Sequence, residues 1–149
     1  MAREPALIMD KGTGIMYRYW SAPSADAVFL LVHGLGAQSA RWEFCANFLR
    51  ERGAALYALE LRGFGETTGP RGHVDSFLTY YADIAAISRI IRSNCPRWTL
   101  FMLGESMGGL LAFSAMERDP SLADGLVCMA PAFWNRLPFS AADYLRFLT

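Results

Sequence analysis

The chain has 149 residues, 53% of them hydrophobic, which suits a single domain with one buried core. Its 14 basic and 14 acidic side chains cancel and no run of like charge occurs, so nucleic acid is not an expected partner. No apolar stretch approaches the roughly 18 residues of a membrane span, and the mixed charges at the N-terminus do not resemble a secretory signal. These features predict a cytoplasmic protein that is soluble or peripheral to a membrane.

The three cysteines are odd in number and far apart along the chain: Cys45, Cys95 and Cys128. Such spacing provides neither a disulfide framework nor a set of zinc ligands. We therefore expect buried thiols, and no metal or cofactor is implied.

Short apolar runs alternate with longer stretches of helical period, which is typical of an α/β fold with a mostly parallel sheet and helices on both faces. Residues 7–9 and 15–20 flank a Lys-Gly-Thr-Gly turn and predict an antiparallel hairpin at one edge of the sheet. Residues 27–32 are continuously apolar, as a central strand covered on both faces would be. Further elements are predicted in chain order: a helix over 41–52 with Gly53 as its cap, a strand over 56–61, a glycine-rich loop over 62–65, a helix from Phe77 capped by Asp75 or Ser76, a strand over 99–103, a helix over 107–118 and a strand over 126–129.

Two of these helices carry apolar stripes at spacings of three and four, which predict their buried faces. In the first the stripe is Trp42, Cys45, Phe48 and Leu49, and in the second it is Phe77, Tyr80, Ile84, Ile87 and Ile91.

The motif that indicates chemistry is Gly-Glu-Ser-Met-Gly at residues 104–108, which fits G-x-S-x-G between a predicted strand and a predicted helix. A tight strand-to-helix turn would push the hydroxyl of Ser106 out at the carboxyl edge of the sheet, where the helix N-terminus favours negative charge. A serine that only caps the helix is the alternative, but capping does not explain the glycines on both sides. The G-x-G-x-x-G fingerprint of dinucleotide binding is absent. We therefore interpret Ser106 as a nucleophile.

A second motif, His-Gly-Leu-Gly at residues 33–36, directly follows the central strand. Paired backbone N–H groups that stabilise an oxyanion are worth about 3 kcal/mol each, and we expect the amides of Leu35 and Met107 to be that pair. His33 could serve as a base, but a strand-end histidine before a glycine turn is more often structural. The residues expected to support the site structurally are His33, Gly34, Gly36, Gly104, Glu105, Gly108 and Gly109.

Taken together, these motifs resemble the α/β-hydrolase superfamily, in its branch of monoacylglycerol lipases and lysophospholipase-like esterases. The resemblance runs from about residue 28 to 131 and rests on four segments: residues 33–36, 61–65, 69–77 and 104–109. Two departures are interpreted as loop-packing variation: Glu60 replaces the branch's aspartate, and Phe64 with Thr67 replace its histidine and serine. The resemblance implies a serine esterase or lipase that hydrolyses lipid or small apolar esters through an acyl-enzyme on Ser106.

The triad partners of Ser106 are missing from the 149 residues. The order in this superfamily is Ser, acid, His, whereas His33 and His73 both precede Ser106. The acids after it stand too early to match the family's triad acid: Glu117, Asp119, Asp124 and Asp143. Loss of the base from such a triad costs on the order of a millionfold in turnover, so this chain alone is expected to be nearly inert.

The resemblance divides the chain into residues 1–131, the N-terminal part of a hydrolase core, and residues 132–149, the start of a lid. It implies two further strands and a covering helix beyond Thr149, so the fold is expected to be truncated before its last strands. Phe133, Trp134 and Phe139 suit contact with lipid at an acyl pocket, or equally the core of a helical insertion. The alternative function is a non-catalytic fragment or interaction module, completed by another chain or by itself through an open sheet edge near Val127.

Overall fold

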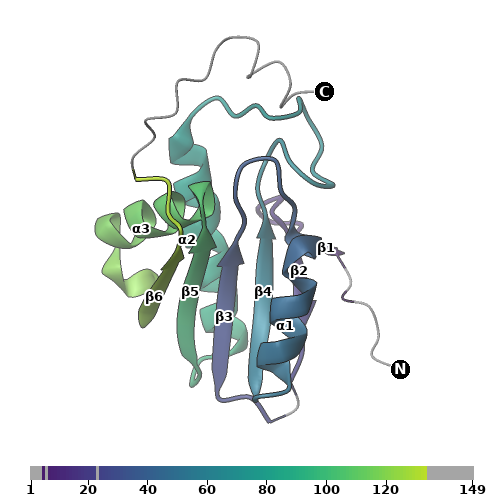
Figure 1. Ribbon diagram of the computed structural model, residues 1–149, viewed down its shortest axis with the longest axis vertical. Helices are drawn as coiled ribbons and strands as arrows, with labels where there is room; N and C mark the ends of the chain where they lie inside the picture. Colours follow the sequence, from purple (N-terminus) through teal and green to yellow (C-terminus); the bar gives the residue numbers. More distant parts are fainter. Residues whose placement is uncertain (1–4, 6, 23, 134–149) are drawn as a thin grey trace.

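The structure is a computed structural model that describes residues 5, 7–22 and 24–133 (Figure 1). In that part of the chain six strands form one mixed sheet, in the order β1-β2-β4-β3-β5-β6. The strands are β1 (Leu7–Met9), β2 (Met16–Trp20), β3 (Ala27–Val32), β4 (Ala54–Glu60), β5 (Thr99–Glu105) and β6 (Gly125–Met129). The helices are α1 (Glu43–Arg50), α2 (Phe77–Asn94) and α3 (Met107–Arg118), with 3₁₀ helices at Ser39–Trp42 and Pro120–Leu122.

The sheet combines an antiparallel edge with a parallel centre. β1 pairs antiparallel with β2, and β2 pairs antiparallel with β4. The strands β4, β3, β5 and β6 run parallel to one another. The predicted α/β class, the mostly parallel sheet and the N-terminal hairpin are therefore confirmed.

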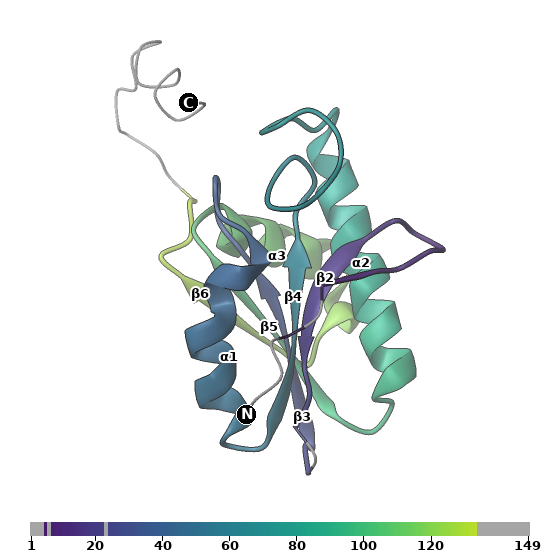
Figure 2. The ribbon, with the colours of Figure 1, turned by 90° about the vertical axis from the view of Figure 1, so that its right-hand side faces the viewer.

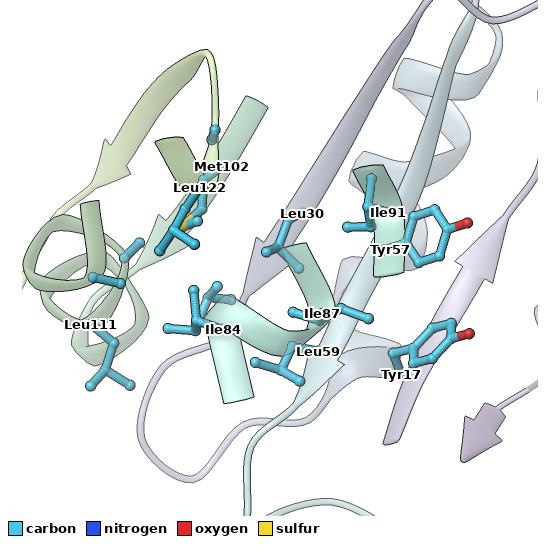
Figure 3. Packing of buried hydrophobic residues seen from close by; sticks show 14 of the residues in the cluster. Tyr17, Leu30, Tyr57, Leu59, Ile84, Ile87, Ile91, Met102, Leu111 and Leu122 are labelled. Carbon is cyan, nitrogen blue, oxygen red and sulfur yellow. The ribbon is translucent and has the colours of Figure 1, made fainter. Parts of the chain in front are cut away.

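Helices cover both faces of the sheet, as predicted. Figure 2 shows α1 on one face and α2 with α3 on the other. The larger core lies on the α2 side, where Leu30, Leu59 and Met102 from the strands pack against Ile84 and Ile87 of the helix (Figure 3). The predicted buried face of α2 is confirmed except at its first residue: Phe77 is 51% exposed.

The first crossover helix differs from its prediction. Instead of one helix over 41–52, a 3₁₀ helix at Ser39–Trp42 precedes α1, which ends at Arg50. The chain begins to turn at Ser39 because the backbone N–H and the hydroxyl of that residue bind the buried carboxylate of Glu60. The predicted stripe is only partly buried, since Trp42 is 5% exposed but Phe48 is 47% exposed.

None of the helices that the structure describes is long and apolar enough to cross a bilayer. The expectations about Trp134, Phe139 and the lid lie outside the described residues, apart from positions 132 and 133.

Candidate active site at the carboxyl edge of the sheet

The register of the sheet brings the two predicted motifs together. β3 and β5 are parallel neighbours, and Val32 stands opposite Gly104. Because parallel strands end at the same edge, the residues that follow them leave the sheet side by side. The structure therefore places His33 and Gly34 beside Glu105 and Ser106.

Ser106 stands on a strained bend between β5 and α3. Its φ of 54° and ψ of −119° are unusual for a residue with a side chain, and such a conformation costs on the order of 1–3 kcal/mol. Hydrogen bonds on both sides maintain it: the Ser106 amide donates to the carbonyl of Met129 at 2.9 Å, and its carbonyl accepts from Leu110 and Ala132. The bend is thus fixed from β6 and α3 together.

The hydroxyl of Ser106 is not used to cap the helix. Ser106 occupies the N-cap position of α3, but its side chain makes no capping hydrogen bond. Ser106 instead lines a pocket of about 200 Å³ at the sheet edge. The alternative of a purely capping serine therefore finds no support in this geometry.

The glycines around Ser106 allow main-chain atoms to approach closely. A Cβ on Gly104 would lie 2.3 Å from the carbonyl oxygen of Gly108, and a Cβ on Gly108 would lie 2.2 Å from that of Val32. Both distances are far below van der Waals contact, so α3 packs directly on the backbone of two strands. A Cβ on Gly34 would lie 3.2 Å from the Cβ of Ser106 and 3.7 Å from its Oγ. The turn after β3 is therefore in close contact with the serine.

The pocket is lined by the turn at residues 34–37 and by Arg41, Glu105 and Ser106. Leu35 belongs to its lining, and its side chain is 63% exposed. Met107 begins α3 and is not part of the lining. Among the described residues, the backbone amides of Leu35 and Met107 have no hydrogen-bond partner.

Two opposite charges lie in the lining of this pocket. Nε of Arg41 lies 3.5 Å from Oε2 of Glu105. The Arg41 side chain is 63% exposed and that of Glu105 is 30% exposed, so water screens the pair and its contribution to stability is small. The sequence patterns did not reveal this pair, because the two residues are 64 positions apart and Arg41 belongs to no spaced motif.

His33 is buried beneath the turn and both of its ring nitrogens are engaged. The amide of Leu61 donates to Nε2 at 3.1 Å, so the ring proton is on Nδ1, which donates to the carbonyl of Gly34 at 2.8 Å. Burial lowers the pKa of His33, against smaller opposing effects from Gly34, Glu60 and Glu105. The imidazole is therefore neutral and has no free nitrogen with which to accept a proton.

A second cavity, of about 460 Å³, lies between the hairpin and the loop after β4. It contains His73, whose Nε2 is 3.2 Å from Oδ1 of Asp75, but Ser106 is not in its lining. Nearby, Arg62 makes two hydrogen bonds to the buried carboxylate of Asp83, and these tie the loop to α2. The larger cavity is thus separate from Ser106.

Of the predicted residues around acyl binding, only Phe133 is described. It is 51% exposed and its ring meets that of Phe113 on α3, with centroids 5.0 Å apart. It does not line the pocket of Ser106.

A mostly parallel sheet with an antiparallel hairpin, and a serine on a positive-φ bend between a strand and a helix, define the α/β-hydrolase fold. The family model described as serine aminopeptidase, S33 (Hydrolase_4) matches residues 23–149, and the chain belongs to this family.

Similar proteins include several lipases. The chain is 26% identical over 128 residues to the monoglyceride lipase of Rattus norvegicus, covering 85% of this chain and 42% of the relative. It is 31% identical over 126 residues to the phospholipase YtpA of Bacillus subtilis, covering 83% and 47%. The structure of the monoacylglycerol lipase of Paleococcus ferrophilus superposes with a TM-score of 0.74 at 26% identity, covering 86% of this chain and 47% of that one. The chain thus spans less than half the length of these proteins.

Proposed function

We propose that the chain forms the nucleophile-bearing part of a serine hydrolase that cleaves carboxylic esters. In this reaction Oγ of Ser106 attacks the ester carbonyl, a base takes the hydroxyl proton and returns it to the leaving alcohol, and water then hydrolyses the acyl-serine. The observation that carries the proposal is the bend at Ser106: its backbone strain is maintained, its side chain does not cap the helix, and the residue lines a pocket. Strain of this kind persists where a fixed geometry serves function.

The amides of Leu35 and Met107 are proposed to bind the oxyanion. Support comes from the position of Leu35 in the pocket lining and from the lack of a hydrogen-bond partner for either amide among the described residues. Met107 is also the first residue of α3, where the helix dipole favours negative charge.

We propose that the base and the acid come from outside these 149 residues. Neither histidine of the chain suits the role, since His33 has both nitrogens engaged and His73 lines the other cavity. A later part of the same polypeptide or a second chain would supply both groups. We expect the 149 residues alone to hydrolyse esters very slowly, because only oxyanion and binding effects would remain.

The test is labelling with a fluorophosphonate, which reacts with activated serines. A form extended or complemented to include a base should be labelled, the Ser106→Ala variant should not, and the isolated 149-residue chain should react far more slowly. Ser93→Ala, on the exposed end of α2, serves as the matched control and should label normally. Labelling that survives in Ser106→Ala would refute the assignment.

Lipid monoesters are the substrate class we propose, because the similar proteins include monoglyceride lipases and a phospholipase. Phe133 and the two aromatic residues beyond the described part, Trp134 and Phe139, are proposed to contact the acyl chain or a membrane surface. Comparing a monoacylglycerol, a lysophospholipid and an aminoacyl amide as substrates of the complemented form tests this choice. Faster cleavage of the amide would contradict it.

One observation favours a second candidate, an interaction module without catalysis. Among the described residues β6 pairs with β5 alone, and its side chains Val127 and Met129 are 42% and 46% exposed. An unpaired apolar edge is a template for association with another chain or a second copy. This candidate predicts that the chain self-associates or binds an apolar dye, whereas a stable monomer without dye binding would count against it.

A further inference from the structure

A buried carboxylate lies below the turn that faces Ser106. Glu60 is the last residue of β4 and is 2% exposed. Its Oε2 accepts hydrogen bonds from the backbone N–H of Ser39, at 3.0 Å, and from the Ser39 hydroxyl. Its Oε1 accepts from the backbone N–H of Glu66 at 3.3 Å. One carboxylate therefore joins the end of the turn after β3 to the loop after β4.

The charge of Glu60 has no ionic partner. It makes no ion pair with any residue that the structure describes, so neutral donors alone compensate for its burial. Burying a charge in this way is costly unless every lone pair is used. Gly65 shows how closely the loop fits around it, since a Cβ there would lie only 1.1 Å from Oε1.

The turn is fixed at its start as well as at its end. At the start the His33 ring accepts from the amide of Leu61, the residue after Glu60, and at the end Ser39 binds Glu60 itself. The four turn residues of the pocket lining, 34–37, lie between these two points. Both ends of the turn are thus hydrogen-bonded to neighbouring residues, Glu60 and Leu61, at the carboxyl end of β4.

We propose that Glu60 is a positioning residue: its carboxylate holds the 34–37 turn at the distance from Ser106 at which the Leu35 amide reaches the oxyanion. This inference rests on the proposed function for its catalytic meaning. Its structural content, that Glu60 sets the order of this turn, can be measured separately.

The informative variant is Glu60→Gln, which keeps the shape of the side chain. Gln presents one oxygen and one NH₂ group, so the N–H of Ser39 or that of Glu66 would face a donor instead of an acceptor. Ser39→Ala removes only the hydroxyl and should have a smaller effect in the same direction. Glu51→Gln, an exposed residue after α1, is the matched control.

The first measurement is hydrogen exchange on the full 149-residue chain. In Glu60→Gln, the amides of Ala37 and Ser39, which are hydrogen-bonded in this turn, should exchange about tenfold faster or more, while β5 and α3 keep their wild-type protection. Equal acceleration in all segments would mean a general loss of stability and would overturn the proposal. So would unchanged exchange in the turn of a folded variant.

The second measurement is the fluorophosphonate reaction of Ser106 in the complemented form, with the binding constant separated from the maximal rate. Glu60→Gln should lower the maximal rate about tenfold, because displacement of one oxyanion donor affects the transition state, and should leave reagent binding unchanged. An unchanged maximal rate would overturn the positioning role. If wild-type Ser106 does not react at all, the proposed hydrolase function fails, and hydrogen exchange still decides whether Glu60 orders the turn.

Discussion

At the scale of single residues, the site depends on glycines whose importance comes from distances between main-chain atoms. The G-x-S-x-G pattern predicted a sharp bend, and the structure shows why its glycines are needed: Gly104 and Gly108 lie where α3 touches the sheet. The sequence could indicate these residues because their spacing is local. It could not indicate the contact between Glu60 and Ser39, because these two residues are 21 positions apart in the sequence and meet only in the folded chain.

We predict that Gly108→Ala destabilises the protein by roughly 2–4 kcal/mol, because the new methyl group would overlap the carbonyl of Val32 and force α3 off β3. Urea unfolding measures the change. Gly12→Ala is the control, since a Cβ there meets Asp10 at an ordinary 3.5 Å, and it should be nearly neutral. Equal midpoints for the two variants would contradict the close packing of α3.

The buried imidazole predicts a pH dependence. Because burial lowers the pKa of His33 in the folded protein, the unfolded chain binds a proton more readily as pH falls below about 6.5. The contribution of His33 to the free energy of unfolding is therefore complete above that pH and is lost as pH falls toward the folded pKa. Unfolding at pH 7.5 and 5.5 should show this loss in the wild type. His33→Gln keeps an acceptor for the Leu61 amide but does not titrate, so its loss over the same range should be smaller, and an identical loss would refute the attribution.

At the scale of elements, strong local patterns predicted helices and strands well. The bounds of β3 and α3 agree with the prediction. A continuous apolar run marks β3, and an interval between glycine and proline marks α3, so neither depends on long-range contacts. The predicted start of the first crossover helix was wrong. The hydrogen bond from Ser39 to Glu60 tightens the chain into a 3₁₀ turn before α1 begins. Strand β4 starts at Ala54, two residues before the predicted start at residue 56. The prediction missed these two residues because Ala54 and Ala55 lack the β-branched side chains that indicate a strand.

The capping of α2, which the sequence left open between two residues, is resolved in favour of Ser76. Its side chain accepts a hydrogen bond from the amide of Leu78 at 3.2 Å, whereas the carboxylate of Asp75 is 99% exposed and faces His73. We expect Ser76→Ala to lower the free energy of unfolding by about 1 kcal/mol. Asp75→Ala should cost less, and thermal or urea unfolding of both variants would show a reversed order if Asp75 were the true cap.

At the scale of the whole molecule, the alternation of elements predicted the fold class but not the strand order. Nothing in the local pattern of β4 shows that it inserts between β2 and β3, because that position depends on how the crossover through α1 returns to the sheet. Likewise, the meeting of residues 33–36 with Ser106 requires the parallel pairing of β3 with β5. The resemblance to a known family supplied this arrangement where spacing alone could not.

The exposed β6 strand leads to a prediction about association. Val127→Lys places a charge on the outer strand and should reduce any self-association and apolar dye binding of the chain, with a stability change within about 0.5 kcal/mol. Phe44→Lys is the control, because Phe44 is 86% exposed on α1, away from that edge. Sedimentation velocity and dye fluorescence measure the effect. Equal effects from both substitutions would show that the edge has no special role.

The contact of α3 with β3 and β5 has a consequence for how such a protein can diversify. Because backbone atoms alone set the closest approach, replacing side chains elsewhere on α3 or along the outer parts of the strands need not shift the serine. The polar and apolar character around the 200 Å³ pocket can therefore vary, for example at Arg41 and Glu105, while the hydroxyl of Ser106 keeps its place. Differences in substrate preference would then arise in the surrounding loops. The part that stays the same would be the backbone contact of α3 with β3 and β5, in which no side chain takes part.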